Sequence, residues 1–390
     1  MEARIDPPRT AGRRPPSGPA RGTRRRLLLL GAGIAAGRLV LACAGPEAAR
    51  WPLRDAAGEE VVLVRRLAGM GTGLEIALAG ISRPAALAAS ERAVQALEAV
   101  EARLSTWRPD SELARLNAAP AGVPQPLSPA LALDLMAARR WWEATGGAFD
   151  PSVGDLVRLW RLREGGPRPG DPPPRPPDPA DRPSFADLAL AGTSAIRLDP
   201  RLVLEEGGFG KGVGLDAALA ALRAAGEPRA LLDLGGQLAF LAGARPWRVR
   251  VADPRARDRA VVELAVAGAG SLATSGSSER GIVADGVRLS HILDPRTARP
   301  APAFGSVTVL AASATAADCL STGLYAMGPD GALAWWRSGA GEEARVELLL
   351  LLEIPGGLRG IATPGLRDRL RVLAGDLSLA FLDPEPPSER

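Results

Sequence analysis

The stretch "GGFGKGVGLD", which runs from Gly207 to Asp216, places five glycines around Lys211, the one lysine among the 390 residues. Leucines follow at helical spacing, so the stretch predicts a glycine-rich turn that leads into a helix. Such a turn brings backbone N–H groups close to an anion, and the helix N-terminus adds partial positive charge. The pattern is neither a Walker A loop nor a dinucleotide fingerprint. These residues alone are equally compatible with an ordinary turn that carries a solvated lysine.

The segments on either side favour an α+β fold with mixed or antiparallel sheets and flanking helices. The predicted elements show no regular β-α-β alternation and no internal repeat, which argues against a doubly wound parallel sheet. In chain order we predict strands at 59–64 and 74–78, helices over 85–104 and from Ser128 onward, a strand near 195–198, strands from 230 onward that include "WRVRV" (247–251), and a helix over 314–327.

Residues 164–184, "EGGPRPGDPPPRPPDPADRPS", form a proline-rich insertion. Proline has no backbone N–H and cannot sustain a sheet ladder, so this segment is predicted to be an extended surface loop. We expect it to interrupt a main domain over 51–385, which follows a leader over 1–44.

The basic character of the chain is concentrated in this leader. The pI is 9.9, but the first 42 residues carry nine arginines and two acids, which leaves about −3 of net charge for the rest. Nucleic acid is therefore not an expected partner. The segment "TRRRLL" (23–28) before a moderate apolar run resembles a twin-arginine export signal, and Cys43 ends an imperfect lipoprotein box. We expect a periplasmic protein, with removal of the leader or lipid anchoring to the membrane through Cys43 both open; a basic tail without export function is the alternative.

Three further residue types occur once each, as Asn117, Tyr325 and His291. His291, in "SHILDPRTARP", is suited to general acid–base work or to binding a phosphate, although a structural histidine is the simpler interpretation. Asn117 is most simply explained by capping or turn chemistry near Ser111, which is predicted to cap a short helix, and Tyr325 by the core.

Asp318 and Thr322 lie four residues apart on the helix predicted over 314–327, so both side chains project from one face. A carboxylate and a hydroxyl are hard oxygen ligands that suit Mg²⁺ when substrate phosphates complete the shell. Alternatively, Asp318 only interacts favourably with the dipole at a helix start.

Taken in order, eight segments between about Met70 and Met327 resemble the FAD:protein FMN transferase family, formerly called thiamine-biosynthesis lipoproteins. They are "MGTGLEIAL", "LSTWRPDSELARLN", "GGAFDPSVGDLVRLW", "EEGGFGKGVGLD", "LLDLGGQLAF", "ATSGSSER", "SHILDPRTARP" and "AADCLSTGLYAMG". The resemblance implies a flavin-transferase fold of the T-fold-like kind. It also implies Mg²⁺-dependent transfer of FMN from FAD to a threonine hydroxyl of an acceptor protein, with release of AMP.

The resemblance also implies roles for individual residues. Asp318 and Thr322 match the family's metal ligands, with Ser321 and the backbone at Gly208 as weaker members. Lys211 is expected near the phosphates of the dinucleotide, and His291 is the candidate for activating the acceptor hydroxyl or assisting the departure of AMP. The positions expected to contact FAD are Met70, Trp107, Ala148, Phe149, Asp150, Glu205 and Ile292.

The chain departs from the family pattern at several positions. Glu205-Glu206 replaces the common Asp-Leu, Ala298 replaces a glycine, and Ser277 and Ser278 replace other residue types. An extra carboxylate at Glu206 would repel a pyrophosphate unless other groups compensate. Two alternatives remain. One is an FAD pyrophosphatase that yields FMN and AMP, since the sequence does not distinguish water from threonine as the acceptor. The other is a non-catalytic exported FAD-binding assembly factor, which Glu205-Glu206 makes plausible. The leader, by analogy, indicates an acceptor flavoprotein in a periplasmic or membrane electron-transfer complex.

Overall fold

The computed structural model describes residues 61–168, 174–226, 228–276, 282–284 and 287–382. Contacts divide the chain into Met1–Arg38 and Leu39–Arg390, and all described residues belong to the second unit. The predicted leader, Cys43, Ser277 and Ser278 lie outside the described residues. Within the described part, no helix combines the length and apolar content needed to cross a membrane.

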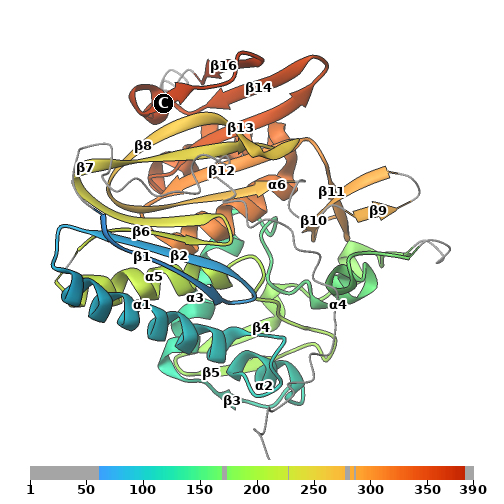
Figure 1. Ribbon diagram of the computed structural model, residues 1–390. Helices are drawn as coiled ribbons and strands as arrows, with labels where there is room; N and C mark the ends of the chain where they lie inside the picture. Colours follow the sequence, from blue (N-terminus) through green and yellow to red (C-terminus); the bar gives the residue numbers. More distant parts are fainter. Residues whose placement is uncertain (1–60, 169–173, 227, 277–281, 285–286, 383–390) are drawn as a thin grey trace, which may run out of the picture. The chain divides into compact units, whose positions relative to one another are not determined.

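One large sheet organises this unit, in the order β1-β2-β6-β7-β8-β12-β13-β14-β16, with β15 added beside β8 (Figure 1). Neighbours along this order are antiparallel except β14 and β16, which run parallel. The strands are β1 Val61–Gly69, β2 Thr72–Ala79, β6 Arg229–Leu234, β7 Gln237–Asp253, β8 Ala256–Gly276, β12 Gly305–Ala311, β13 Glu347–Ile354, β14 Gly357–Ala362, β15 Leu370–Val372 and β16 Leu377–Phe381.

Two small sheets flank the large one. One has the order β3-β5-β4 and the other β11-β10-β9. Their strands are β3 Gln125–Pro126, β4 Leu188–Ala191, β5 Ser194–Arg197, β9 Ile282–Ala284, β10 Val287–Asp294 and β11 Arg299–Pro302. The mixture of antiparallel sheets and helices confirms the predicted α+β class.

The helices are α1 Arg83–Leu104, α2 Glu112–Ala118, α3 Pro129–Ala144, α4 Gly154–Leu159, α5 Gly210–Ala224, α6 Ala314–Trp335 and α7 Gly341–Glu343, with a π-helix at Trp336–Ala340. Short 3₁₀ turns occur at η1 Leu162–Glu164, η2 Pro179–Asp181, η3 Phe185–Asp187 and η5 Pro364–Arg369. Ser111 and Ser128 accept backbone hydrogen bonds at the starts of α2 and α3, as predicted for helix caps.

The apolar periodicity of α1 and α5 places both helices against the β1, β2 and β6 end of the large sheet (Figure 1). Leu97 of α1 and Leu219 of α5 share one buried cluster with Leu78 of β2. Helix α6 instead packs with α3 and with β12, where Leu320 and Leu324 are fully buried. The glycine-rich start of α5 is thereby held between the sheet and α6.

The prediction of a helix over 314–327 is confirmed. Within α6 the helical geometry is broken directly after Met327 by Gly328, whose φ is 76°, and a second helical stretch follows from Pro329. Glycine adopts this backbone conformation without a steric penalty, and proline is tolerated at the first turn of a helix. The sequence pattern therefore marks the end of the first helical stretch, and the second stretch was not predicted.

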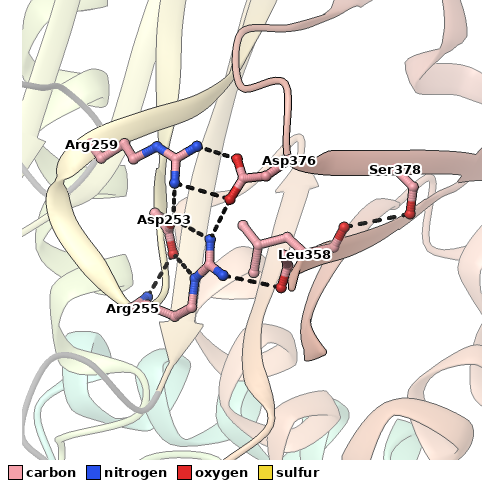
Figure 2. Close-up of polar contacts among 7 residues, drawn as sticks. Asp253, Arg255, Arg259, Leu358, Asp376 and Ser378 are labelled. Atoms are coloured by element: carbon pink, nitrogen blue, oxygen red, sulfur yellow. Dashed lines mark hydrogen bonds and ion pairs between the residues drawn. The ribbon is translucent and has the colours of Figure 1, made fainter. Parts of the chain in front are cut away.

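A network of two arginines and two aspartates joins the β7–β8 hairpin to the β14–β16 end of the sheet (Figure 2). Arg255 binds Asp253 at 2.8 Å and Asp376 at 3.0 Å, and Arg259 binds the same two carboxylates. Arg255 also donates to the carbonyl of Gly357 at 3.1 Å. These contacts fix the last strands of the large sheet to its longest hairpin.

Candidate functional site

The glycine-rich turn, the start of α5 and one face of α6 enclose a pocket with β10 and with the segment that leads into α4. Its volume of about 250 Å³ is below the roughly 300–1,000 Å³ typical of sites that enclose a whole ligand. The lining residues are Trp107, Ala148, Phe149, Asp150, Pro151, Val153, Val157, Leu162, Arg163, Glu205, Glu206, Gly207, Gly208, Lys211, Gly235, Gln237, Ala273, Thr274, Ser275, His291, Ile292, Leu293, Pro295, Asp318, Ser321 and Thr322.

Twelve of the thirteen residues proposed from the sequence line this one pocket, and Met70 does not. Met70 occupies the turn between β1 and β2 with a φ of 49°, and its N–H donates to Glu101 at 3.1 Å. Its side chain lies against the first turns of α5, since a Cβ added to Gly214 would meet the Met70 sulfur at 2.8 Å. Met70 thus packs against the glycine-rich start of α5 without lining the pocket, and its predicted contact with FAD stays a prediction.

Lys211 and Asp318 meet at the start of α5. Lys211 Nζ lies 3.2 Å from Asp318 Oδ1, while Asp318 Oδ2 accepts the N–H of Gly212 at 2.9 Å. The carboxylate therefore lies at the positive end of the α5 dipole, which favours a negative charge. Asp318 interacts with the dipole of α5 rather than with that of its own helix, a contact that the sequence pattern did not predict.

The oxygen atoms around Asp318 fit a hard divalent cation. The Asp318 side chain is buried yet lines the pocket, and Ser321 and Thr322 follow it on the same helix. A Cβ placed on Gly208 would lie 3.5 Å from Thr322 Oγ1, so the turn and this hydroxyl are close neighbours. The described residues include no group of three or more His, Cys, Asp or Glu side chains arranged to hold a metal. One carboxylate with hydroxyl and backbone oxygens suits Mg²⁺, which retains water and substrate phosphates in its shell.

Ser321 and Cys319, two neighbours of Asp318 on α6, are each restricted in the role that they can take. Ser321 Oγ accepts from Ser275 Oγ at 3.0 Å and donates to the Asp318 carbonyl at 3.1 Å, so its hydroxyl is the less available ligand. Burial raises the pKa of the Cys319 thiol well above its ordinary value. Cys319 therefore stays protonated near neutral pH, which excludes it as a thiolate nucleophile.

The extra carboxylate of Glu206 is compensated locally. Thr106 Oγ1 donates to Glu206 at 2.6 Å and lies 3.0 Å from Glu205, and Arg163 pairs with Glu205 at 2.8 Å. Burial is the main cause that raises the pKa of Glu206, with the neighbouring Glu205 charge acting in the same direction. Arg163 thus offsets the charge of Glu205, and the raised pKa of Glu206 shifts its equilibrium towards the neutral form.

Asp150 shapes the wall that carries Ala148 and Phe149. Its carboxylate accepts the N–H of Ser152 at 2.7 Å and the indole N–H of Trp142 at 3.2 Å. Burial raises the pKa of Asp150 despite these hydrogen bonds. The carboxylate therefore fixes the loop that forms this wall.

His291 lies in β10 and lines the pocket beside Ile292. Asp294 is the last residue of β10, three positions after His291, and its carboxylate is paired with Arg296 at 2.9 Å. Arg296 also donates to the carbonyl of Ala326 in α6 at 3.1 Å, which ties this loop to the helix that carries Asp318. The predicted chemical role of His291 stays a prediction.

Several residues that shape the site were not predicted from the sequence. Asn117 makes two hydrogen bonds to the backbone of Leu204, at 2.8 and 2.9 Å, and so holds the chain that enters the glycine-rich turn. The single occurrence of asparagine was a usable signal, although local turn chemistry was the wrong interpretation of it. Arg163 and Gln237 also line the pocket, as does Glu206, which the sequence had already placed near the pyrophosphate. No local pattern marks Arg163 or Gln237 as pocket residues.

The chain is similar in sequence to a known family of proteins. The model of the ApbE family matches residues 70–346. A FAD:protein FMN transferase of Rhodobacter capsulatus is 35% identical over 280 residues, which are 69% of this chain and 51% of that protein. The chain thus spans about half the length of that relative. A FAD:protein FMN transferase of Vibrio cholerae is 32% identical over 68% of this chain and 80% of its own.

Solved structures show the same fold. The ApbE protein of Thermotoga maritima is 25% identical with a TM-score of 0.66, over 74% of this chain and 94% of its own. The flavin transferase ApbE of Vibrio cholerae is 28% identical with a TM-score of 0.64, over 79% of this chain and 98% of its own.

Proposed function

This chain belongs to the ApbE family of flavin transferases, and we propose that it transfers the FMN part of FAD to a threonine hydroxyl of an acceptor protein in a Mg²⁺-dependent reaction that releases AMP. The relatives named FAD:protein FMN transferase support the reaction class. The observation that carries the proposal is the meeting of Lys211, Asp318 and the glycine-rich turn in one pocket with His291.

In the proposed reaction the threonine oxygen attacks the phosphorus of the FMN half, and the bond from that phosphorus to the bridging oxygen breaks. AMP leaves with the bridging oxygen, and His291 takes the hydroxyl proton. Lys211 and the N–H groups at the start of α5 offset the charge of the pyrophosphate. Asp318 and Thr322, with Ser321 and the carbonyl of Gly208 as weaker ligands, would hold Mg²⁺. When bound, Mg²⁺ supplies neutralisation of charge on the phosphate oxygens.

We further propose that the chain acts in the periplasm on a flavoprotein of an electron-transfer complex, either released or tethered through Cys43. The twin-arginine-like leader supports this location. Fractionation of cells, with and without Arg24→Lys plus Arg25→Lys, tests it. Retention of the double variant in the cytoplasm is expected, and equal export of both forms would contradict the proposal.

The activity is tested by incubating the protein with FAD, MgCl₂ and a purified acceptor. Flavin fluorescence that stays with the acceptor in a denaturing gel, together with AMP, is expected, and EDTA or replacement of the target threonine by alanine should abolish it. Free FMN and AMP without a labelled acceptor would favour the pyrophosphatase. Retained FAD without turnover would favour the non-catalytic binder. Lys211→Ala and Asp318→Ala should both lose activity, and full Mg²⁺-dependent activity in both would refute the site assignment.

A further inference from the structure

The Arg163 side chain crosses one wall of the pocket. Its Nη2 donates to both carboxylate oxygens of Glu205, at 2.8 and 2.9 Å, and to Thr106 Oγ1 at 2.6 Å. These partners lie 42 and 57 positions away along the chain. One guanidinium therefore connects the loop after α1 to the residue that enters the glycine-rich turn.

The same guanidinium lies over Trp107. Arg163 Cζ is 4.5 Å from the centroid of the indole, within the range of a favourable cation–π interaction. The Trp107 side chain lines the pocket although the residue is 63% exposed, so apolar packing constrains its ring only in part. Arg163 covers one face of the indole, which leaves the opposite face for another planar group.

The chemistry of this contact requires arginine rather than lysine. A guanidinium is planar, so it can lie flat on the indole while its Nη2 binds the Glu205 carboxylate. A lysine ammonium would keep a charge beside Glu205 but could not lie flat on the indole of Trp107. The two substitutions at this position therefore separate the ion pair from the stacking.

The backbone before Arg163 is held in an uncommon conformation. Arg161 has a φ of 51°, and its carbonyl accepts the N–H groups of Glu164 at 3.0 Å and Gly166 at 2.9 Å. A non-glycine residue with positive φ costs free energy and persists only where its surroundings enforce it. This turn directs Arg163 to the pocket wall immediately before the proline-rich insertion.

We propose that Arg163 is a positioning residue for a planar ring of the bound dinucleotide. It fixes the Trp107 indole relative to the Glu205 carboxylate, and the ring stacks on the open face of the indole. The inference rests on the proposed function, because it takes the ligand to be FAD. The isoalloxazine and adenine rings share the planar aromatic chemistry that this surface recognises.

Calorimetric titration with FAD, FMN and ADP tests the proposal, since it requires no acceptor protein. We expect Arg163→Ala to weaken FAD binding about tenfold and Arg163→Lys to give an intermediate loss. In a Trp107→Ala background, Arg163→Ala should weaken FAD binding by a factor at least about threefold smaller, because the effects of two coupled residues are not additive. Arg201→Ala, which removes an exposed partner of Asp199 outside the pocket lining, is the matched control and should bind as the parent does.

Weaker binding of FMN but not of ADP would place the isoalloxazine ring on Trp107, and the reverse would place adenine there; either result supports the proposal. FAD binding by Arg163→Ala equal to that of the parent, or an equal loss with and without Trp107, would overturn it. Melting temperatures of the variants show whether a loss of binding comes from a general loss of structure. If Arg163→Ala is unstable, Arg163→Lys is compared instead, alone and combined with Trp107→Ala. With acceptor present, KM for FAD should rise while kcat changes less. A parent that binds FAD without transferring FMN would contradict the proposed function and leave this test intact.

Discussion

Asp216 of α5 and Asp318 of α6 each accept hydrogen bonds from the first turn of the other's helix. Asp216 binds the N–H groups of Ala314 and Thr315 at 2.7 and 2.9 Å and the hydroxyl of Ser313 at 2.8 Å. Asp318 in turn binds the N–H of Gly212. This reciprocal arrangement satisfies N–H groups that would otherwise have no partner within either helix.

We expect Asp216→Ala to lower the free energy of unfolding by about 2 kcal/mol, the upper range for the loss of a helix cap. Urea denaturation measures this change. Asp199→Ala removes a carboxylate that pairs with the exposed Arg201 and should change stability by less than about 0.5 kcal/mol. Equal stability of Asp216→Ala and the parent would show that the reciprocal caps do not hold α5 and α6 together.

Gly212 permits the close approach of the two helices. A Cβ at this position would lie 2.5 Å from the carbonyl oxygen of Ala314 and 2.6 Å from the Cα of Thr315, and backbone atoms cannot move aside cheaply. Gly212→Ala should therefore destabilise the protein by roughly 3 kcal/mol or prevent folding, as overpacking at a backbone contact does. Gly207→Ala is the control, because a Cβ there would meet nothing within 4 Å, and thermal denaturation should distinguish the two variants. A Gly212→Ala protein that melts with the parent would refute this account.

The backbone of Ala298 is strained. The family resemblance implies a glycine at this position. Ala298 is fully buried with a φ of 56°, and Trp160 donates its indole N–H to the Ala298 carbonyl at 3.1 Å. Because glycine adopts positive φ freely, Ala298→Gly should stabilise the protein by about 0.5–1 kcal/mol after the greater entropy of glycine in the unfolded chain is included. Ala301→Gly, at a buried position without positive φ, should destabilise it. Chemical denaturation that places both variants on the same side of the parent would contradict the prediction.

The network in Figure 2 predicts loss of stability in acid. Hydrogen bonds from Arg259 and Arg255 lower the pKa of Asp376 from 3.8, and although burial opposes the shift, Arg255 and Arg259 also lower the pKa of Asp253. A carboxylate with a lowered pKa stabilises the fold above its unfolded pKa, and this contribution is lost as pH falls through the lower folded value. Melting temperature should therefore fall more steeply below about pH 4 in the parent than in Asp376→Asn. Parallel pH profiles for the two proteins would count against a role for this network.

The resemblance to a known family brought most of the site residues together in the prediction, whereas helix periodicity and cap residues, which are local signals, predicted the elements that carry them. Lys211 and Asp318 were expected in one site and are in contact, and Ser128 caps the helix that it was expected to cap. Arg163 and Asn117 act across 42 and 87 positions, and no local pattern encodes such partners. The break after Met327 was predicted, but the second helical stretch of α6 beyond Gly328 was not.

The hydrogen bond from Gly212 to Asp318 spans 106 positions, and β6, β7, β8 and β12 lie between its ends. A nascent chain that has left the ribosome only as far as β12 thus carries the glycine-rich turn without its carboxylate partner. Nucleotide affinity should emerge late in synthesis, after residue 322 is free to fold. A ligand that binds only the folded protein stabilises it. Binding of such a ligand would therefore indicate that folding is complete.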